Sequence, residues 1–182
     1  APRRGPAAPA GGFIGGIRPP ATDDKDARKP VPAYTGTDPK RDPFYVRGTS
    51  SEHLLAYGML PMSPLVDWDT LQRTLDRAEE NFGWKGGSWS WNYPTFAMNA
   101  TRLLRPELAV RIVTMDNRDD LLLPSGNNYR SDRLRMYTPG NGGFLLAVAM
   151  MCAGWDGCEV ENPGFPKDGT WNVRWEGLKP MP

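Results

Sequence analysis

Three short clusters of aromatic and amide side chains contain the residues of this chain that could do chemistry. They contribute Trp89, Trp91, Asn92, Tyr93, Asn128, Tyr129, Arg130 and Asn141. Indole and phenol rings stack on the apolar faces of sugar rings, whereas amide and guanidinium groups hydrogen-bond to hydroxyls. This mixture predicts a carbohydrate-binding site if the fold brings the clusters together. Each cluster also has a structural interpretation: tryptophans that pack the core, glycines beside Asn141 that serve a turn, and an ordinary polar loop around Asn128.

Composition excludes several other classes of function. The chain has 182 residues, with 22 basic and 21 acidic side chains, so no general affinity for nucleic acid is expected. The single histidine, His53, excludes sites built on paired histidines, and two cysteines do not form a zinc site. We therefore expect no metal and no cofactor. Cys152 is interpreted as a core residue, with a disulfide to Cys158 as the alternative.

A catalytic carboxylate pair does not stand out, although glycoside hydrolysis usually requires one. Asp132 is the weak candidate near the clusters, and the catalytic residues remain unassigned. The longest apolar run, residues 144–153, is shorter than the roughly 20 residues needed to cross a bilayer. No membrane association is predicted.

The elements that must position the clusters are helices. A glycine-rich turn precedes the apolar run, so residues 140–153 are predicted to form a helix that is apolar on every face and therefore buried. Apolar residues also dominate 94–104, another inner helix. Residues 67–82 and 106–116 carry one apolar stripe each and are predicted to be outer helices.

Such alternation is typical of a toroid of helical hairpins, in which all inner helices begin at the same end. The three clusters precede inner elements, so they should meet at one mouth. Shorter signals are a capping box at Thr49–Glu52 that opens a helix ending at Gly58, a strand-like insertion at 121–123, and a short strand where Trp171, Val173 and Trp175 alternate with polar residues.

Residues 1–48 differ from the rest because they are rich in proline, glycine, alanine and charge. They are predicted to be a disordered arm, with an extended arm lying on a partner as the alternative. The fold predicted from these patterns is therefore all-α: an arc of a toroid of helical hairpins over 49–182, a disordered N-terminal arm and a short C-terminal strand-like tail.

The region 49–182 resembles the C-terminal part of six-hairpin, (α/α)6-barrel glycosidases. These are the α-L-fucosidase-like and maltose- or trehalose-phosphorylase-like enzymes and their uncharacterised bacterial cousins. The resemblance is carried by the segments 89–94, 123–129, 139–151, 153–157, 162–166 and 171–178. It specifies the predicted toroid as a partial (α/α)6 barrel. It also implies that the barrel cleaves glycosidic bonds, with sugar bound where the inner helices begin.

Two positions depart from that pattern. Pro139 stands where fucosidase-like enzymes keep a catalytic aspartate, and Asn92 stands where an acid is expected in the cousins. The family's general acid lies upstream of the matching region. The resemblance therefore implies a fragment of a glycoside hydrolase that forms one wall of the sugar site without a complete catalytic pair.

The expected partners are an oligosaccharide or glycoside, together with the rest of the barrel or a second copy of the chain. The alternative functions are a non-catalytic sugar-binding module and a helical scaffold. The compartment is undetermined, and an extracytoplasmic parent protein is compatible with the sequence.

Overall fold

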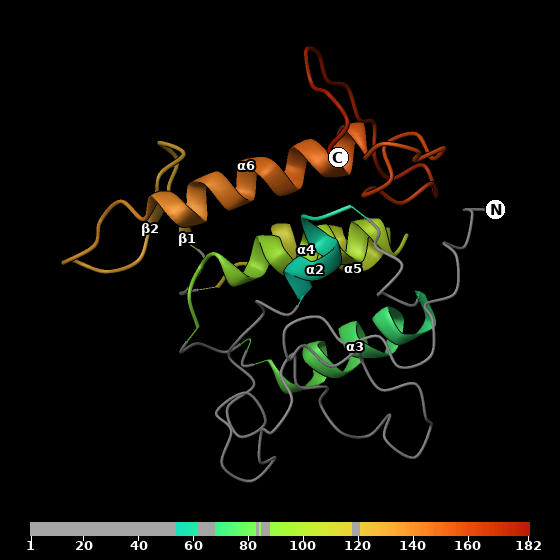
Figure 1. Cartoon of the computed structure of the whole chain (residues 1–182). Helices are drawn as coiled ribbons and strands as arrows, with labels where there is room; N and C mark the ends of the chain where they lie inside the picture. The colour runs from blue at the N-terminus through green and yellow to red at the C-terminus, as the bar shows by residue number, and fades with distance from the viewer. Residues whose placement is uncertain (1–53, 62–67, 83, 85–87, 118–120) are drawn as a thin grey trace, which may run out of the picture.

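The computed structural model of this chain describes residues 54–61, 68–82, 84, 88–117 and 121–182. These residues form five helices and one two-stranded hairpin, so the prediction of a mostly helical protein is confirmed (Figure 1). In chain order the elements are α2 (Leu55–Gly58), α3 (Trp68–Asn81), α4 (Asn92–Arg102), α5 (Pro106–Val113), β1 (Leu121–Leu122), β2 (Asn128–Tyr129) and α6 (Thr138–Ala153). The arm at 1–48 and the capping box at Thr49–Glu52 lie outside the described residues.

Helix α4 is the centre of the fold. All of its residues are buried, and α2, α5 and α6 pack against it. Its polar side chains bond to backbone carbonyls: Asn99 donates to Leu54 O at 2.9 Å, and Thr101 donates to Ala97 O at 2.8 Å. This satisfies the buried donors of both side chains, which lets the helix lie in the interior. The prediction of an inner helix here is confirmed.

Helix α3 covers one side of the core as an amphipathic outer helix. Leu71, Leu75 and Ala78 are buried at i, i+4 and i+7, whereas Asp76 and Glu80 face outward. Exposed ion pairs tie α3 to the residues around α5, between Asp76 and Arg105 and between Glu79 and Arg111. The predicted outer helix is therefore confirmed.

Helix α6 differs from its prediction. Ala147, Met150 and Met151 are fully buried, but Leu145 is 68% exposed. The expectation that α6 is buried on every face is wrong for the described structure, because α4 and the C-terminal tail cover one side of α6 and leave the other open. No helix among the described residues is long and apolar enough to span a membrane.

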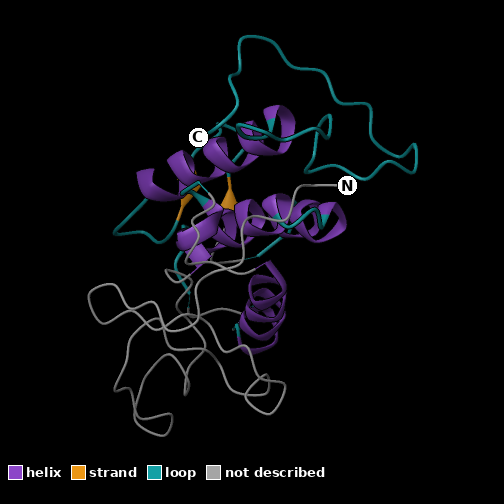
Figure 2. Ribbon diagram, turned by 45° about the vertical axis from the view of Figure 1, so that its right-hand side comes forward, coloured by secondary structure: helices purple, strands orange, loops and turns teal. Residues whose placement is uncertain are grey.

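The sequence predicts two short strand-like segments, and the structure contains one of them. Leu121 pairs with Tyr129 and Leu122 with Asn128 in an antiparallel hairpin beside the start of α6 (Figure 2). The predicted strand at 171–175 is wrong, since that segment is irregular. Its indoles instead have local partners: Trp171 packs on the ring of Phe165, and Trp175 donates to Asn162 Oδ1 at 2.8 Å.

The chain end returns to the C-terminal end of α6. Asp156 N donates to Met181 O at 2.7 Å, and Met181 N donates to Gly154 O at 3.0 Å. Cys152 is buried and Cys158 is half-buried, and both are free thiols. The interpretation of Cys152 as a core residue is confirmed.

Candidate functional site

Helices α4 and α6 begin at the same end of the molecule and run in the same direction (Figure 1). A Cβ at Gly143 would lie 2.7 Å from Pro94 Cγ, and further along both helices Leu146 and Met98 line one groove. Because α4 follows the first cluster and α6 contains the third, the parallel arrangement brings both clusters to one end. The hairpin that carries the second cluster lies there as well.

Asn141 joins the second cluster to the third. Its Oδ1 accepts a hydrogen bond from Asn128 N at 3.0 Å, and its Nδ2 donates to Gly126 O at 2.6 Å. In addition, Tyr137 N donates to Asn128 O at 2.8 Å. The amide of Asn141 therefore holds the hairpin against the first turn of α6, and its two polar atoms are engaged by the chain itself.

Asn128 is fully buried beneath this junction. Its Nδ2 donates to Leu121 O at 3.3 Å, whereas its Oδ1 has no hydrogen-bond partner among the described residues. That oxygen is pressed against Gly140, since a Cβ on Gly140 would lie 2.8 Å from Asn128 Cγ and 3.0 Å from Ser90 Cβ. Gly140 thus permits the close approach of all three clusters.

The two glycines of this turn form a matched pair for mutation. Gly140→Ala is expected to lower the free energy of unfolding by about 1–3 kcal/mol, because the added methyl overlaps the Asn128 side chain. Gly142→Ala is expected to raise it by about 0.4–1 kcal/mol, because a Cβ there meets nothing within 4 Å and the unfolded chain loses freedom. Urea unfolding of both variants measures the difference, and equal effects would contradict the close packing at Gly140.

The surface at this end is formed by Trp89, Arg130 and Tyr137, which we call the mouth cluster. The Trp89 side chain is 48% exposed. The Arg130 guanidinium carbon lies 5.2 Å from the centre of the indole, and the Tyr137 ring lies 5.5 Å from it with a 33° tilt. Both contacts restrain the indole at the surface. Tyr137 was not among the predicted site residues, although its position directly before the glycine-rich turn is a signal that could have suggested it.

Tyr129 lies at the same hairpin but bonds to its own loop. Its hydroxyl donates to Asp132 Oδ1 at 2.8 Å, and this hydrogen bond raises the pKa of Tyr129. Burial raises the pKa of Tyr137, and the nearby positive charge of Arg130 acts in the opposite direction. Both phenols are therefore neutral donors near pH 7 and do not act as bases.

Two predicted site residues lie in the interior. Tyr93 is fully buried, with its ring 5.7 Å from both Phe82 and Trp84. Asn92 is also buried and donates from Nδ2 to Ser88 Oγ at 2.7 Å. The first turn of α4 points Tyr93 into the core, so Tyr93 is not presented to a ligand. Asn92 is buried as well but borders the groove described next.

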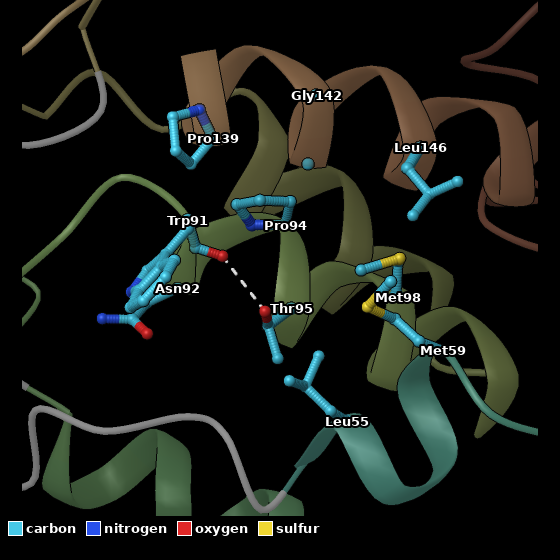
Figure 3. Close-up of a pocket in the computed structure, with 11 residues that line it drawn as sticks. Leu55, Met59, Trp91, Asn92, Pro94, Thr95, Met98, Pro139, Gly142 and Leu146 are labelled. Atoms are coloured by element: carbon cyan, nitrogen blue, oxygen red, sulfur yellow. Dashed lines mark hydrogen bonds between the residues drawn. The ribbon is translucent and has the colours of Figure 1, made fainter. Parts of the chain in front are cut away.

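Trp91 faces a different feature, a half-open groove of about 330 Å³ (Figure 3). We call it the apolar groove. It runs between α2, α4 and α6 and is lined by Leu55, Met59, Trp91, Asn92, Pro94, Thr95, Met98, Pro139, Gly142, Gly143 and Leu146. Its two polar side chains are bonded within the protein: Asn92 to Ser88, and Thr95 Oγ1 to Trp91 O at 3.0 Å.

Carboxylates are scarce at this end. Asp132 is the only acidic residue between 121 and 153, and it accepts the bond from Tyr129. Asp119 and Asp120 lie outside the described residues. Within the described part of the chain, no group of three or more His, Cys, Asp or Glu residues could hold a metal ion. The stretch 121–153 therefore offers polar and aromatic binding groups and a single carboxylate, which cannot by itself form an acid–base pair.

Comparisons with models of protein families, with curated proteins and with solved structures found no match to this chain.

Proposed function

We propose that this chain is part of a carbohydrate-active helical protein and forms one wall of its sugar site. The observation that carries the proposal is the meeting of the three clusters at the shared start of α4 and α6. There Trp89 presents a half-exposed indole in contact with Arg130 and Tyr137. A sugar ring can stack on such an indole while a guanidinium and phenol hydroxyls bond to its hydroxyls.

The proposed ligand is an oligosaccharide or a glycoside. Among the predicted residues, the proposed contacts are Trp89, Tyr129 and Arg130, and Tyr137 joins them. Asn128 and Asn141 act as positioning residues, because their hydrogen bonds hold the hairpin and the first turn of α6 in register.

The proposed role of the chain by itself is binding and not cleavage. Hydrolysis of a glycosidic bond usually uses two carboxyl groups, about 5–5.5 Å apart in retaining enzymes and 6.5–9.5 Å apart in inverting ones. Asp132 is the single carboxylate in the stretch 121–153. If the parent is a glycoside hydrolase, we propose that at least one member of its catalytic pair comes from outside this chain.

A partial (α/α)6 toroid is the architecture that we propose for 49–182. Its support is the parallel direction of α4 and α6, with α5 following α4 after three residues and packing against it. The open side of α6 also fits this proposal, because further hairpins of a toroid would cover it. We propose that the rest of the barrel covers this face of α6, and that a second copy of the chain covers it when the barrel is absent.

Sugar binding is tested by titrating the chain with a panel of mono- and oligosaccharides, followed by NMR chemical shifts of the indole N–H groups. Trp89→Ala is expected to weaken binding at least tenfold, because the sugar loses the ring on which it stacks. Trp171→Ala is the matched control, since Trp171 is similarly exposed at 42% but lies in the segment that follows α6. The absence of binding to every sugar, or equal losses in both variants, would contradict the proposal.

A helical scaffold is the second candidate function, and the open side of α6 favours it. Exposed apolar surface of this kind promotes association, and Leu145 is an exposed large hydrophobic residue on α6. The isolated chain is therefore expected to self-associate.

Leu145→Glu is expected to shift the chain toward the monomer, because the substitution places a charge on the face that associates. Sedimentation velocity at two or more protein concentrations measures the change. Thr138→Glu, at an exposed position in the first turn of the same helix, is the charge-matched control. A wild-type chain that stays monomeric at high concentration would argue against both the scaffold and the missing-barrel interpretations.

A further inference from the structure

We propose that the apolar groove binds the aromatic aglycone of a glycoside whose sugar is held at the mouth cluster. This inference rests on the proposed function and adds the chemical class of the ligand. The groove and the mouth cluster are adjacent, because each helix start contributes to both. Trp89 and Tyr137 belong to the mouth cluster, and Trp91 and Pro139, two residues further along, line the groove (Figure 3).

The lining decides what the groove can accept. The hydroxyl of Thr95 bonds to Trp91 O, and the amide of Asn92 bonds to Ser88. Few polar groups of the lining are left to replace the bonds to water that a hydroxyl-rich sugar ring would lose there. An apolar group has no such penalty, so the groove selects the part of the ligand that has no hydroxyls.

The wall residues favour a flat aromatic group. Trp91 is 43% exposed, and two methionines line the groove, Met59 directly after α2 and Met98 in α4. Thioether groups make favourable contacts with aromatic rings, and indoles stack on them. The volume of about 330 Å³ lies near the lower limit for small-molecule sites, which suits one aromatic group and not an oligosaccharide.

Gly142 keeps the groove open. It lines the groove, and a Cβ added there would meet nothing within 4 Å. Gly142→Leu should therefore place its side chain in the empty space without displacing a neighbour. Thr138→Leu adds a leucine in the first turn of the same helix at an exposed position that does not line the groove, so it is the matched control.

The test compares the affinities of methyl and phenyl glycosides of D-glucose and D-galactose, in both anomers, by calorimetry or NMR. Phenyl glycosides are expected to bind at least tenfold more tightly than the methyl glycosides of the same sugar. Gly142→Leu should remove this advantage, and Thr138→Leu should retain it. Trp91→Ala, which removes a wall of the groove and leaves the mouth cluster in place, is a second variant that should also reduce the advantage.

Equal affinity of the phenyl and methyl forms would overturn the inference while leaving sugar binding intact, and so would an advantage that survives Gly142→Leu. If no glycoside binds, the proposed function fails. The binding of phenol by itself then tests whether the groove is an aromatic site. Phenol binding that Gly142→Leu abolishes would support an aromatic site without the sugar, and no phenol binding would overturn that site too.

Discussion

Replacing Arg102 with alanine is expected to lower the free energy of unfolding by about 3–5 kcal/mol, one of the two largest effects that we predict for this chain. Arg102 is 1% exposed at the end of α4. Its Nε donates to Gly58 O at 3.3 Å, and its Nη2 donates to Pro182 O. The side chain therefore connects α2, α4 and the C-terminal end, three segments far apart in sequence.

Aromatic rings complete the surroundings of Arg102. Its guanidinium carbon lies 5.4 Å from the ring centre of Tyr57 and 5.5 Å from that of Trp155. Burial lowers the pKa of Arg102 and raises that of Tyr57, because burial disfavours the charged form of each group. Truncation to alanine would leave a cavity between the two rings and two carbonyls without their donor.

Two further variants separate the causes. Arg102→Met retains most of the side-chain volume and is expected to be less destabilising than Arg102→Ala. Its expected loss of unfolding free energy is about 1–3 kcal/mol, because two backbone oxygens lose their donor. Arg105→Ala removes an arginine whose ion pair with Asp76 is exposed, and its expected effect is below about 1 kcal/mol. Urea unfolding, with limited proteolysis of residues 156–182 as a local readout, measures each loss. A methionine variant as stable as the wild type would show that the buried charge offsets what its bonds contribute.

Replacing Phe96 with alanine is expected to lower the free energy of unfolding by about 3–5 kcal/mol. Phe96 is fully buried in α4, and its ring lies 4.7 Å from the ring of Phe82 and 5.1 Å from that of Trp84. Tyr93 contacts the same two rings. This aromatic cluster joins the end of α3 to α4. The cavity that Phe96→Ala would create therefore lies where the two helices meet.

Chemical unfolding monitored by near-ultraviolet circular dichroism measures the loss, because the clustered rings dominate that signal. Trp171→Ala is the control for loss of a large aromatic side chain, and its expected effect is below about 1 kcal/mol because Trp171 is 42% exposed. A Phe96→Ala variant that unfolds at the wild-type midpoint would contradict the packing of α3 against α4.

Helices α3 to α6 could be predicted from local patterns, and their observed bounds stay within three residues of the expected ones. Apolar spacing, Pro106 at the start of α5 and the glycine after α6 are short-range signals that any fold of this chain would obey. The strand expected at 171–175 is instructive. Alternation indicates a strand only where a neighbouring strand supplies hydrogen bonds, and among the described residues that segment has none.

The residue types at the site were available from the sequence, whereas their roles were not. Asn92 and Tyr93 follow Trp91 directly, yet they are buried while Trp91 is exposed, because the first turn of α4 aims successive side chains in different directions. Asn128 and Asn141 have the chemistry of sugar ligands but bond to the hairpin and to α6. Tyr137 joins Trp89 only because α4 and α6 run in the same direction.

The sequence by itself determined the helical class, the amphipathic or apolar character of each helix and the location of the polar-aromatic clusters, because these depend on neighbours within a few turns. Only the tertiary structure decided which clustered side chains reach the surface, that α6 is covered on one side and open on the other, and that an apolar groove lies beside the mouth cluster. Those features depend on contacts between residues tens of positions apart, such as Gly143 with Pro94 and Arg102 with Pro182, which no local pattern specifies.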